Sequence, residues 1–542
     1  MTVNVSFRPR PGAVLPALLP ATLLALPLSL SSQNLRAAEA QPQIADAPAD
    51  SDDGDGLEEI VVYGRAERLI GTAATASEGV VGGADLSVRP LLRVAELLEA
   101  VPGLIAAQHS GTGKANQYFL RGFNLDHGTD FSTVVDGVPW NLRSHGHGQG
   151  YLDVNGLIPE VISRIDFRKG PYRADSGDFS LAGAAVMSTI DRLEQPFLTV
   201  AEAGSYDWRR IAAGWGSDFG NDGALLLVGQ FQSYDGPWER PEDLRHYAGY
   251  AKLHTQTSIG RAWASLSIYH ATWNPTEQSP ERAIGTSICA NVFCSMDPTA
   301  TGMTSRQILA GGIDAERWQA NAYVQYYDWN MYSNPTYDFQ IRQRDRRLTY
   351  GYRVQGDLVN SEALHWTLGS EGRYDDIPRV GVDHTDQAQF IEYVSTHAIR
   401  EGSIAAYTEA QWTLAERVRL FAGLRADQYW FDVRALDPQF QGGSASDNQF
   451  SPKAGAAWTI SPQVELYANW GRGFHSNDAR GIAASDPRVP GLMPAEGKEI
   501  GARWQKGSFS FTATYWWLDL DSELKFVGDT NSVEPGPASA RR

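Results

Sequence analysis

Four of the chain's eleven histidines stand at positions 109, 127, 145 and 147. His145 and His147 are separated by a single glycine, so on an extended backbone their imidazoles project from the same face. Together with Asp126 or His127 they would offer a set of ligands that suits Zn²⁺ or Cu²⁺. The alternative is that these residues shape a loop or hydrogen-bond a larger ligand. We therefore take Asp126, His127, His145 and His147 as candidate ligand-binding residues.

The N-terminus has the pattern of an export signal. Arg8 and Arg10 precede an apolar run, and Ala38-Glu39-Ala40 supplies small residues at the spacing that a signal peptidase reads. The run contains prolines and is too short for a comfortable membrane-spanning helix. We predict a signal peptide over residues 1–40, with an N-terminal anchor as the alternative.

Export also decides how the two cysteines are interpreted. Cys289 and Cys294 lie five positions apart between strand-like segments. In an exported protein such a pair is expected to form one loop disulfide rather than a reactive or metal-binding pair. The sequence lacks the Gly-x-Ser-x-Gly, His-Glu-x-x-His and Gly-Lys-Ser/Thr patterns. We therefore expect a protein that is not an enzyme.

The composition narrows the class further. The 542 residues carry a formal net charge of -18, and 11% of them are aromatic. This acidic balance disfavours nucleic acid, because phosphate binding needs clustered Lys and Arg. No stretch after residue 40 approaches the roughly 20 apolar residues of a spanning helix. An exported chain of this kind is expected to be periplasmic or an outer-membrane barrel.

The chain divides into segments of different texture. Residues 41–56 are acidic, rich in Pro and Gly and free of aromatics, which predicts a mobile periplasmic tail. Residues 65–190 mix one helical pattern, at Val94, Leu97, Leu98 and Val101, with short strands separated by Gly-rich connections. The predicted strands include 117–120, 132–135 and 162–167. We expect a compact α+β domain here.

From residue 191 to 542 the pattern changes to long alternating segments. Val464, Leu466 and Ala468 lie on one face of a strand, and Glu465 and Tyr467 lie on the other. A period of two with one lipid-compatible face and one polar face is typical of transmembrane strands. The alternative is a soluble β-sandwich or propeller. The apolar faces often end in Trp or Tyr, as an interfacial girdle requires, and this favours a barrel.

Residues 57–190 resemble the plug domain of TonB-dependent outer-membrane receptors. The stretches that carry the resemblance are Leu97–Leu104, Leu120–Phe123, Val135–Pro139 and Ile162–Pro171. One departure is Lys169, where the family usually carries Arg; it keeps the charge but loses the bidentate fork. The resemblance implies a mainly β protein of the bacterial outer membrane, a transmembrane antiparallel barrel with a small α+β plug in its lumen.

The resemblance also places a TonB box, the segment grasped by the periplasmic energy-coupling protein TonB, at residues 57–64. Its central residues are Glu59, Ile60, Val61, Val62 and Tyr63. A flexible, β-prone segment can add a strand to a sheet edge of the partner and transmit a pull. The alternative is that Ile60-Val61-Val62 is only the first plug strand. The preceding tail is too short for the folded signalling domain of some family members, so we expect a transporter without one.

Other roles follow from the same resemblance. Three plug arginines are similar to those that pair with inward carboxylates of the barrel, which gives a plug–barrel latch of Arg121, Arg164 and Arg168 with candidate partners Glu409, Glu465 and Glu499. The individual pairs are left open, and ordinary wall charge is the alternative. The expected cargo is a ferric siderophore, with a zinc or copper ion bound by plug histidines as the alternative. No further cofactor is expected.

The length of the barrel region raises one further expectation. About fifteen candidate strands follow residue 190, whereas the family's plugged barrels have 22. We therefore expect the chain to be C-terminally truncated, because an unclosed barrel would leave strand edges unpaired in lipid. Two other classes stay open: a passive porin or adhesin barrel, and a secreted β-rich enzyme.

Overall fold

A computed structural model of the chain describes residues 69–541, except 221, 485–488, 508, 523, 528–531 and 536–538. The described residues belong to one compact unit. The predicted signal peptide, tail and TonB box all lie outside the described residues. Within those residues, no helix has the length and apolar character needed to cross a membrane.

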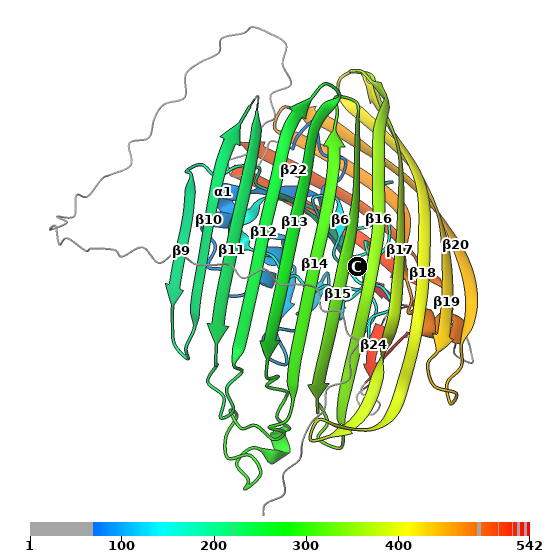
Figure 1. The fold of residues 1–542 in the computed structure, drawn as a ribbon. Helices are drawn as coiled ribbons and strands as arrows, with labels where there is room; N and C mark the ends of the chain where they lie inside the picture. Colours follow the sequence, from blue (N-terminus) through cyan, green and yellow to red (C-terminus); the bar gives the residue numbers. More distant parts are fainter. Residues whose placement is uncertain are drawn as a thin grey trace, which may run out of the picture. The chain divides into compact units, whose positions relative to one another are not determined.

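Sixteen strands form one antiparallel sheet, here called the wall, in the order β26-β23-β22 and then stepwise down to β9. Each strand from β9 to β23 pairs with the next one along the chain, and the sheet curves around the plug (Figure 1). In the part of the chain that the structure describes, no ladder joins β9 to β26. The wall strands are β9 Phe197–Ala203, β10 Arg209–Phe219, β11 Gly223–Tyr234, β12 Leu244–Thr257, β13 Gly260–Trp273, β14 Thr301–Asp314, β15 Trp318–Ser333, β16 Gln340–Asn360, β17 Leu364–Asp386, β18 Gln389–Leu414, β19 Val418–Ala435, β20 Gly443–Ser461, β21 Val464–Ser476, β22 Leu492–Lys506, β23 Phe509–Leu520 and β26 Ser539–Arg541. A separate hairpin pairs β24 Leu524–Val527 with β25 Ser532–Pro535.

The alternating pattern of the wall strands produces an inverted burial. Along β21 the side chain of Leu466 is 36% exposed, whereas its neighbour Glu465 is fully buried. The same holds in β19, where Leu424 faces outward and Arg425 is buried. In a soluble sheet the apolar face would be the buried one, so this arrangement is that of a barrel wall whose apolar face meets lipid. The predicted fold class is confirmed.

The connections at the two ends of the wall differ in length. At one end, here called the turn end, they are short: 258–259, 315–317, 361–363, 415–417 and 462–463. At the opposite end, here called the loop end, several are long, including 235–243, 274–300 and 436–442; the longest stands at the foot of Figure 1. The loop 274–300 contains the short 3₁₀ helix η3 Glu281–Ala283, and the π-helical turn η4 Arg480–Ala484 lies between β21 and β22.

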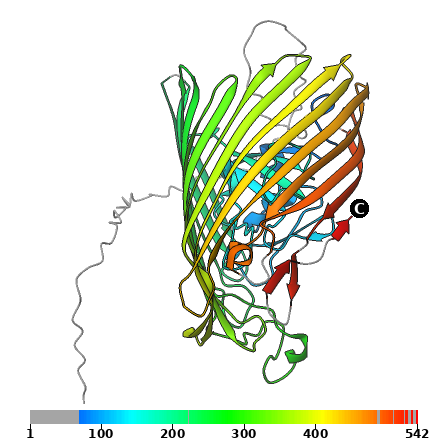
Figure 2. The ribbon, with the colours of Figure 1, turned by 90° about the vertical axis from the view of Figure 1, so that its right-hand side faces the viewer.

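The plug is a small α+β domain inside the curve of the wall (Figure 2). Its five-stranded sheet has the order β1-β7-β8-β5-β6, with β5 and β8 parallel, and a second sheet has the order β2-β3-β4. The plug elements are β1 Gly79–Gly82, α1 Gly83–Ser87, η1 Val94–Ala100, β2 Ile105–Ala107, β3 Gln117–Leu120, β4 Phe123–Asn124, β5 Phe131–Val135, β6 Val138–Pro139, η2 Pro159–Val161, β7 Ile162–Arg168 and β8 Gly183–Thr189.

The helical pattern predicted from Val94 to Val101 forms the 3₁₀ helix η1, which buries Leu97 and Leu98 completely. The glycine after Pro102, Gly103, adopts a positive φ of 82°, which ends the turn. These side chains belong to one apolar cluster shared by the plug and the inner ends of several wall strands. The plug is therefore packed against the wall by apolar contacts as well as by the polar contacts described next.

Candidate functional site

Three plug segments meet near the loop end of the wall. They are 108–116, which joins β2 to β3, the turn 125–130 before β5, and 140–158, which follows β6. The first of them contacts the loop 235–243, because the amide of Thr112 donates a hydrogen bond of 2.7 Å to Glu242. The three segments bring together imidazoles that are far apart in the sequence. We call His109, His127 and His147 the histidine cluster.

His127 stands at the centre of the histidine cluster and is 2% exposed. Its ring centroid lies 5.1 Å from that of His109 and 4.6 Å from that of His147. Its Nδ1 lies 3.1 Å from the carbonyl oxygen of Ala115 and 3.0 Å from that of Asn116. Carbonyl oxygens only accept hydrogen bonds, so Nδ1 carries the proton and Nε2 carries the lone pair.

His147 is oriented in the same way by the wall. Its Nδ1 lies 2.9 Å from Oε1 of Gln343 in β16, and the amide nitrogen of that glutamine points at the carbonyl of Gly146. The amide oxygen accepts, so His147 also holds its proton on Nδ1. Its Nε2 lies 3.0 Å from Nε2 of His127. Two ring nitrogens that both carry lone pairs therefore face each other.

His109 is the member of the cluster that was not among the candidate residues taken from the sequence. Its Nε2 accepts a hydrogen bond of 3.3 Å from the ammonium of Lys114, which also donates to the hydroxyl of Ser110. Lys114 is buried, and this burial lowers its pKa to about 8. His109 lies 18 residues before His127, so spacing gives no signal for their contact; only the fold of the 108–116 segment brings them together.

His145, although two residues from His147, is not part of the cluster. Its ring stacks on Tyr151 with a centroid distance of 4.0 Å and an interplanar angle of 10°. Its Nδ1 accepts a hydrogen bond of 3.1 Å from the backbone amide of His147. The proton is therefore on Nε2, which is buried without a hydrogen-bond partner among the described residues. His145 shapes the loop that presents His147.

Asp126 lies beside the cluster. Its Oδ1 is 3.7 Å from Nε2 of His127, and its Oδ2 is buried without a hydrogen-bond partner among the described residues. Burial raises the pKa of Asp126 to about 6, and it lowers the pKa of His127 to about 3. Burial also lowers the pKa values of His145 and His147 well below the ordinary range. The imidazoles are thus neutral at pH 7 and keep their lone pairs.

No finished metal site is present in the described part of the chain, where no three His, Cys, Asp or Glu side chains converge on one point. Of the four candidate residues taken from the sequence, the structure brings Asp126, His127 and His147 together. It holds His145 apart, against an aromatic ring, and it adds His109.

At the turn end a different set of contacts holds the first described residues of the plug, 69–78. Glu465 of β21 accepts hydrogen bonds from the backbone amide of Gly71 at 3.0 Å and from Arg419 of β19 at 2.8 Å. The same carboxylate also accepts from Thr459 and Tyr467. Arg419 donates in turn to the carbonyl of Ala73 at 2.8 Å, and its Nε and Nη1 have no partner among the described residues.

Two residues of β22 continue this grip. Glu499 accepts from the amide of Ala76 at 3.1 Å and from the hydroxyl of Ser77. Arg503 donates to the carbonyl of Glu78 at 2.8 Å and lies near that of Ala76 at 3.3 Å. The four wall side chains Arg419, Glu465, Glu499 and Arg503 are all buried, and together we call them the clasp. The clasp binds mainly the backbone of residues 71–78.

The expected latch residues are found in three different settings. Arg121 lies 3.8 Å from Glu499 and over the ring of Trp516, both in the wall. Arg164 and Arg168 pair with the plug carboxylates of Asp166 and Asp175, at 2.7 Å each. Glu409 takes Arg173, another plug arginine, at 2.8 Å.

A second group of wall arginines, which the sequence pattern did not predict, donates hydrogen bonds to plug carbonyls. Arg306 donates to the carbonyls of Trp140 and Asp153, and Arg347 donates to that of Arg143. The plug side chain of Arg143 is itself held by Asp178 at 2.9 Å and by the Tyr429 hydroxyl at 2.8 Å. Wall side chains therefore bind plug backbone at several positions between the turn end and the loop end.

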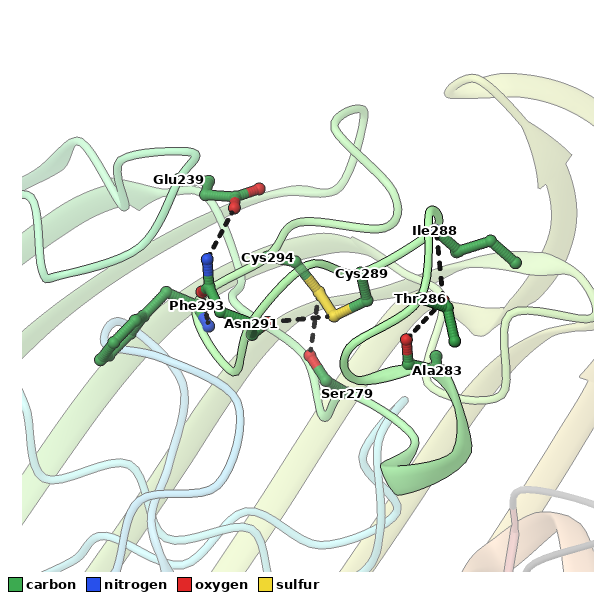
Figure 3. Close-up of a disulfide and its surroundings, with 9 residues drawn as sticks. All are labelled: Glu239, Ser279, Ala283, Thr286, Ile288, Cys289, Asn291, Phe293 and Cys294. Carbon is green, nitrogen blue, oxygen red and sulfur yellow. Dashed lines mark hydrogen bonds between the residues drawn. A yellow bond between two sulfur atoms is a disulfide. The ribbon is translucent and has the colours of Figure 1, made fainter.

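The two cysteines are joined as a disulfide in the loop 274–300 at the loop end, with Cα atoms 5.4 Å apart (Figure 3). Asn291, between them, donates to Glu239 of the neighbouring loop 235–243 at 3.3 Å. The disulfide thus closes a short bend that contacts the adjacent loop. Ile288 and Phe293 are exposed on either side of this bend.

Known protein families match the plug and the wall separately. The TonB-dependent receptor plug domain model matches residues 72–184, and the TonB-dependent receptor-like β-barrel model matches residues 165–538. Solved structures share the fold at low identity. The ferric yersiniabactin uptake receptor FyuA from Yersinia pestis is 16% identical with a TM-score of 0.67; the match covers 82% of this chain and 72% of FyuA.

Two further structures are similar to the same degree. The unliganded ferric citrate transporter FecA is 14% identical with a TM-score of 0.71, over 82% of this chain and 70% of that one. The siderophore receptor PirA from Acinetobacter baumannii is 15% identical with a TM-score of 0.60, over 86% of this chain and 76% of that one. The identities are low enough that these structures support the fold alone. The barrel model, which spans more than half of the chain, shows that the protein belongs to the family of TonB-dependent receptors.

Proposed function

We propose that this receptor actively imports a scarce ligand, a ferric siderophore, across the bacterial outer membrane, with energy supplied by TonB. The observation that carries the proposal is the position of the plug. It lies inside the curve of the wall, is gripped by the clasp at the turn end, and carries the histidine cluster near the loop end. In barrels of this class the short turns face the periplasm and the long loops face the outside.

The direction of coupling follows from the same arrangement. Residues 71–78, which the clasp binds, begin seven positions after the end of the segment 57–64. A pull on that segment by a periplasmic partner would act first on the clasp, and through it on the plug. This supports a role for residues 57–64 as the TonB box, and it supports a transporter over a passive porin or adhesin.

The ligand class is supported by the solved neighbours, whose names describe uptake of ferric yersiniabactin, ferric citrate and siderophores. Near the loop end, the partly buried His109 and His147 offer polar side chains for such a ligand. The apolar outward face of the wall supports placement in the outer membrane.

The test is deletion of residues 58–63, measured as siderophore-dependent growth under iron limitation. The matched control deletes six residues of the acidic tail, 47–52. We expect the first deletion to abolish growth and the control to preserve it, with equal amounts of receptor in the outer membrane. Growth that survives the 58–63 deletion would rule out active transport and favour a passive barrel.

A further inference from the structure

The closest contact within the histidine cluster is an unusual one. The Nε2 atoms of His127 and His147 are 3.0 Å apart, which is hydrogen-bond distance. Each ring donates from Nδ1 to an oxygen that only accepts: backbone carbonyls for His127 and the Gln343 amide oxygen for His147. Neither neutral ring therefore has a proton for the other. The two lone pairs repel unless a cation that binds both nitrogens lies to one side of the line between them.

The outer contacts of the pair match those of metal-binding histidines. A ligating imidazole usually donates its second ring nitrogen to a carbonyl or carboxylate, which fixes the tautomer and aims the lone pair at the ion. Both His127 and His147 have such a partner, although they come from separate segments. His145, whose Nδ1 accepts a hydrogen bond from a backbone amide, does not have this pattern.

The separation of the two nitrogens also fits a metal ion. With bonds of about 2.0–2.1 Å, two ligand nitrogens lie about 3.3 Å apart around tetrahedral Zn²⁺, and about 2.8 Å apart at adjacent corners of a square-planar Cu²⁺ site. The observed 3.0 Å lies between these values. Oδ1 of Asp126 is 3.7 Å from His127 Nε2, and the other oxygen of that carboxylate is unpaired among the described residues.

We propose that His127 and His147 bind one divalent transition-metal ion of the Zn²⁺ and Cu²⁺ class through their Nε2 atoms, with Asp126 as the adjoining carboxylate. The proposal stands apart from siderophore import, since metal binding is measured on the purified receptor without TonB.

The charges that face the site set its strength. Lys114 is the nearby cation, and its ammonium contacts His109 rather than the Nε2 pair. Asp126 offsets that charge, and Glu277 of the loop 274–300 acts on Lys114 from the wall side. If His109 joins as a third imidazole, Lys114 must first leave its Nε2.

The experiment is metal titration of the full-length receptor purified in detergent, by calorimetry for Zn²⁺ and by electron paramagnetic resonance for Cu²⁺. The variants are His127→Asn and His147→Asn. The Asn side-chain amide can replace Nδ1 as the donor to the same oxygens, while Nε2 is lost. The matched control is His145→Asn, from the same His-Gly-His motif. Thermal unfolding of each variant verifies that it is folded.

We expect one saturable site in the wild type, with Cu²⁺ spectra that show two coordinating nitrogens. Each of the first two variants should weaken binding by at least the roughly 10–100-fold that loss of an outer-shell partner costs, and His145→Asn should bind like the wild type. Absence of a stoichiometric site in the wild type would overturn the proposal. Equal binding by His127→Asn, or an equal loss in His145→Asn, would overturn it as well.

Discussion

The two ends of the plug are held by different chemistry. At the turn end, wall side chains reach inward and bind plug backbone: Glu465 accepts from Gly71, and Arg419 donates to Ala73. At the loop end, plug side chains face one another, and His127 and His147 present lone pairs that no hydrogen bond between them satisfies. Buried polar atoms without a partner among the described residues occur at both ends, but those of the clasp belong to Arg419 and Arg503, which already make other hydrogen bonds.

This contrast assigns a mechanical part to one end and a binding part to the other. Backbone contacts do not depend on the plug side chains, so the clasp can hold a segment that consists mostly of Ala, Thr and other small residues. Unsatisfied acceptors in a buried setting are costly unless a ligand completes them. We therefore expect substitutions in the clasp to change plug retention, and substitutions in the histidine cluster to change ligand binding and its pH dependence.

The largest expected effect is at the clasp. Glu465→Ala leaves the buried Arg419 without its carboxylate, which typically costs about 3–5 kcal/mol. The measurement is denaturant unfolding of the receptor in detergent, together with protease access to residues 69–78. The double variant Arg419→Met/Glu465→Leu removes both charges and should recover much of the loss. A double variant as unstable as Glu465→Ala would show that the ion pair is not what holds the segment.

A smaller effect is expected from pH at the histidine cluster. The pKa of His127 is lowered from 6.5 to about 3 in the folded protein, so between these values only the unfolded chain binds the proton. The stability that neutral His127 contributes to the folded protein is present above pH 6.5 and is lost as the pH falls. At pH 5 the free energy of unfolding is lower by about 2 kcal/mol for this reason. Thermal unfolding at pH 7 and pH 5 measures this.

Asp126, whose pKa is raised from 3.8 to about 6, works in the opposite direction, because its protonated form is favoured in the folded protein. The pH dependence of wild-type stability therefore combines two opposite effects, one from His127 and one from Asp126. Comparison with His127→Asn isolates the effect of the histidine. That variant should lose less stability between pH 7 and pH 5 than the wild type. An unchanged difference would mean that His127 does not resist protonation.

Removal of the Lys114 ammonium should strengthen Zn²⁺ binding at the histidine cluster. Lys114→Met takes away the ammonium that contacts His109, so we expect Zn²⁺ to bind about tenfold more tightly, equivalent to about 1.4 kcal/mol. Lys252→Met, which removes a buried lysine that pairs with Asp136 and Asp191, is the control. Weaker Zn²⁺ binding in Lys114→Met alone would place the lysine in the site as a supporting group.

The smallest effect is expected from the loop disulfide. Cys289 and Cys294 are only five residues apart within one connection, and a disulfide stabilises less when the loop it closes is short, so Cys289→Ser/Cys294→Ser should lower the free energy of unfolding by an amount at the low end of the range of about 0–5 kcal/mol seen for disulfides. Protease cleavage in the loop 274–300 should become faster. A large global loss would show that this loop takes part in holding the wall.

The sequence predicted those features that depend on local patterns of apolar and polar residues. The alternation of Leu466 with Glu465 predicted the two faces of β21, and the segment 117–120 forms β3 as predicted. Contacts between distant segments left no such local signal. The plug partners of Glu465 and Glu499 lie hundreds of residues away, and Arg164 pairs with Asp166 of its own strand.

The candidate site shows the same limit. The His-Gly-His motif drew attention to His145 and His147 as a pair on one face, which holds only for a regular extended strand. The segment bends at residues 146 and 147 and forms no strand there, and the two rings take different partners. His109 joined the cluster through a loop contact that spacing does not encode. Orientation by outer hydrogen bonds, not proximity in the sequence, separates the two histidines of the motif.

The most direct test of the division between the two ends is a single-molecule pull on the N-terminus, with the barrel held in a lipid bilayer. We expect the force that first releases the plug to drop in Glu465→Ala and to stay at the wild-type value in His127→Asn. Equal forces in all three proteins, or a drop in His127→Asn alone, would contradict the assignment of the mechanical hold to the clasp.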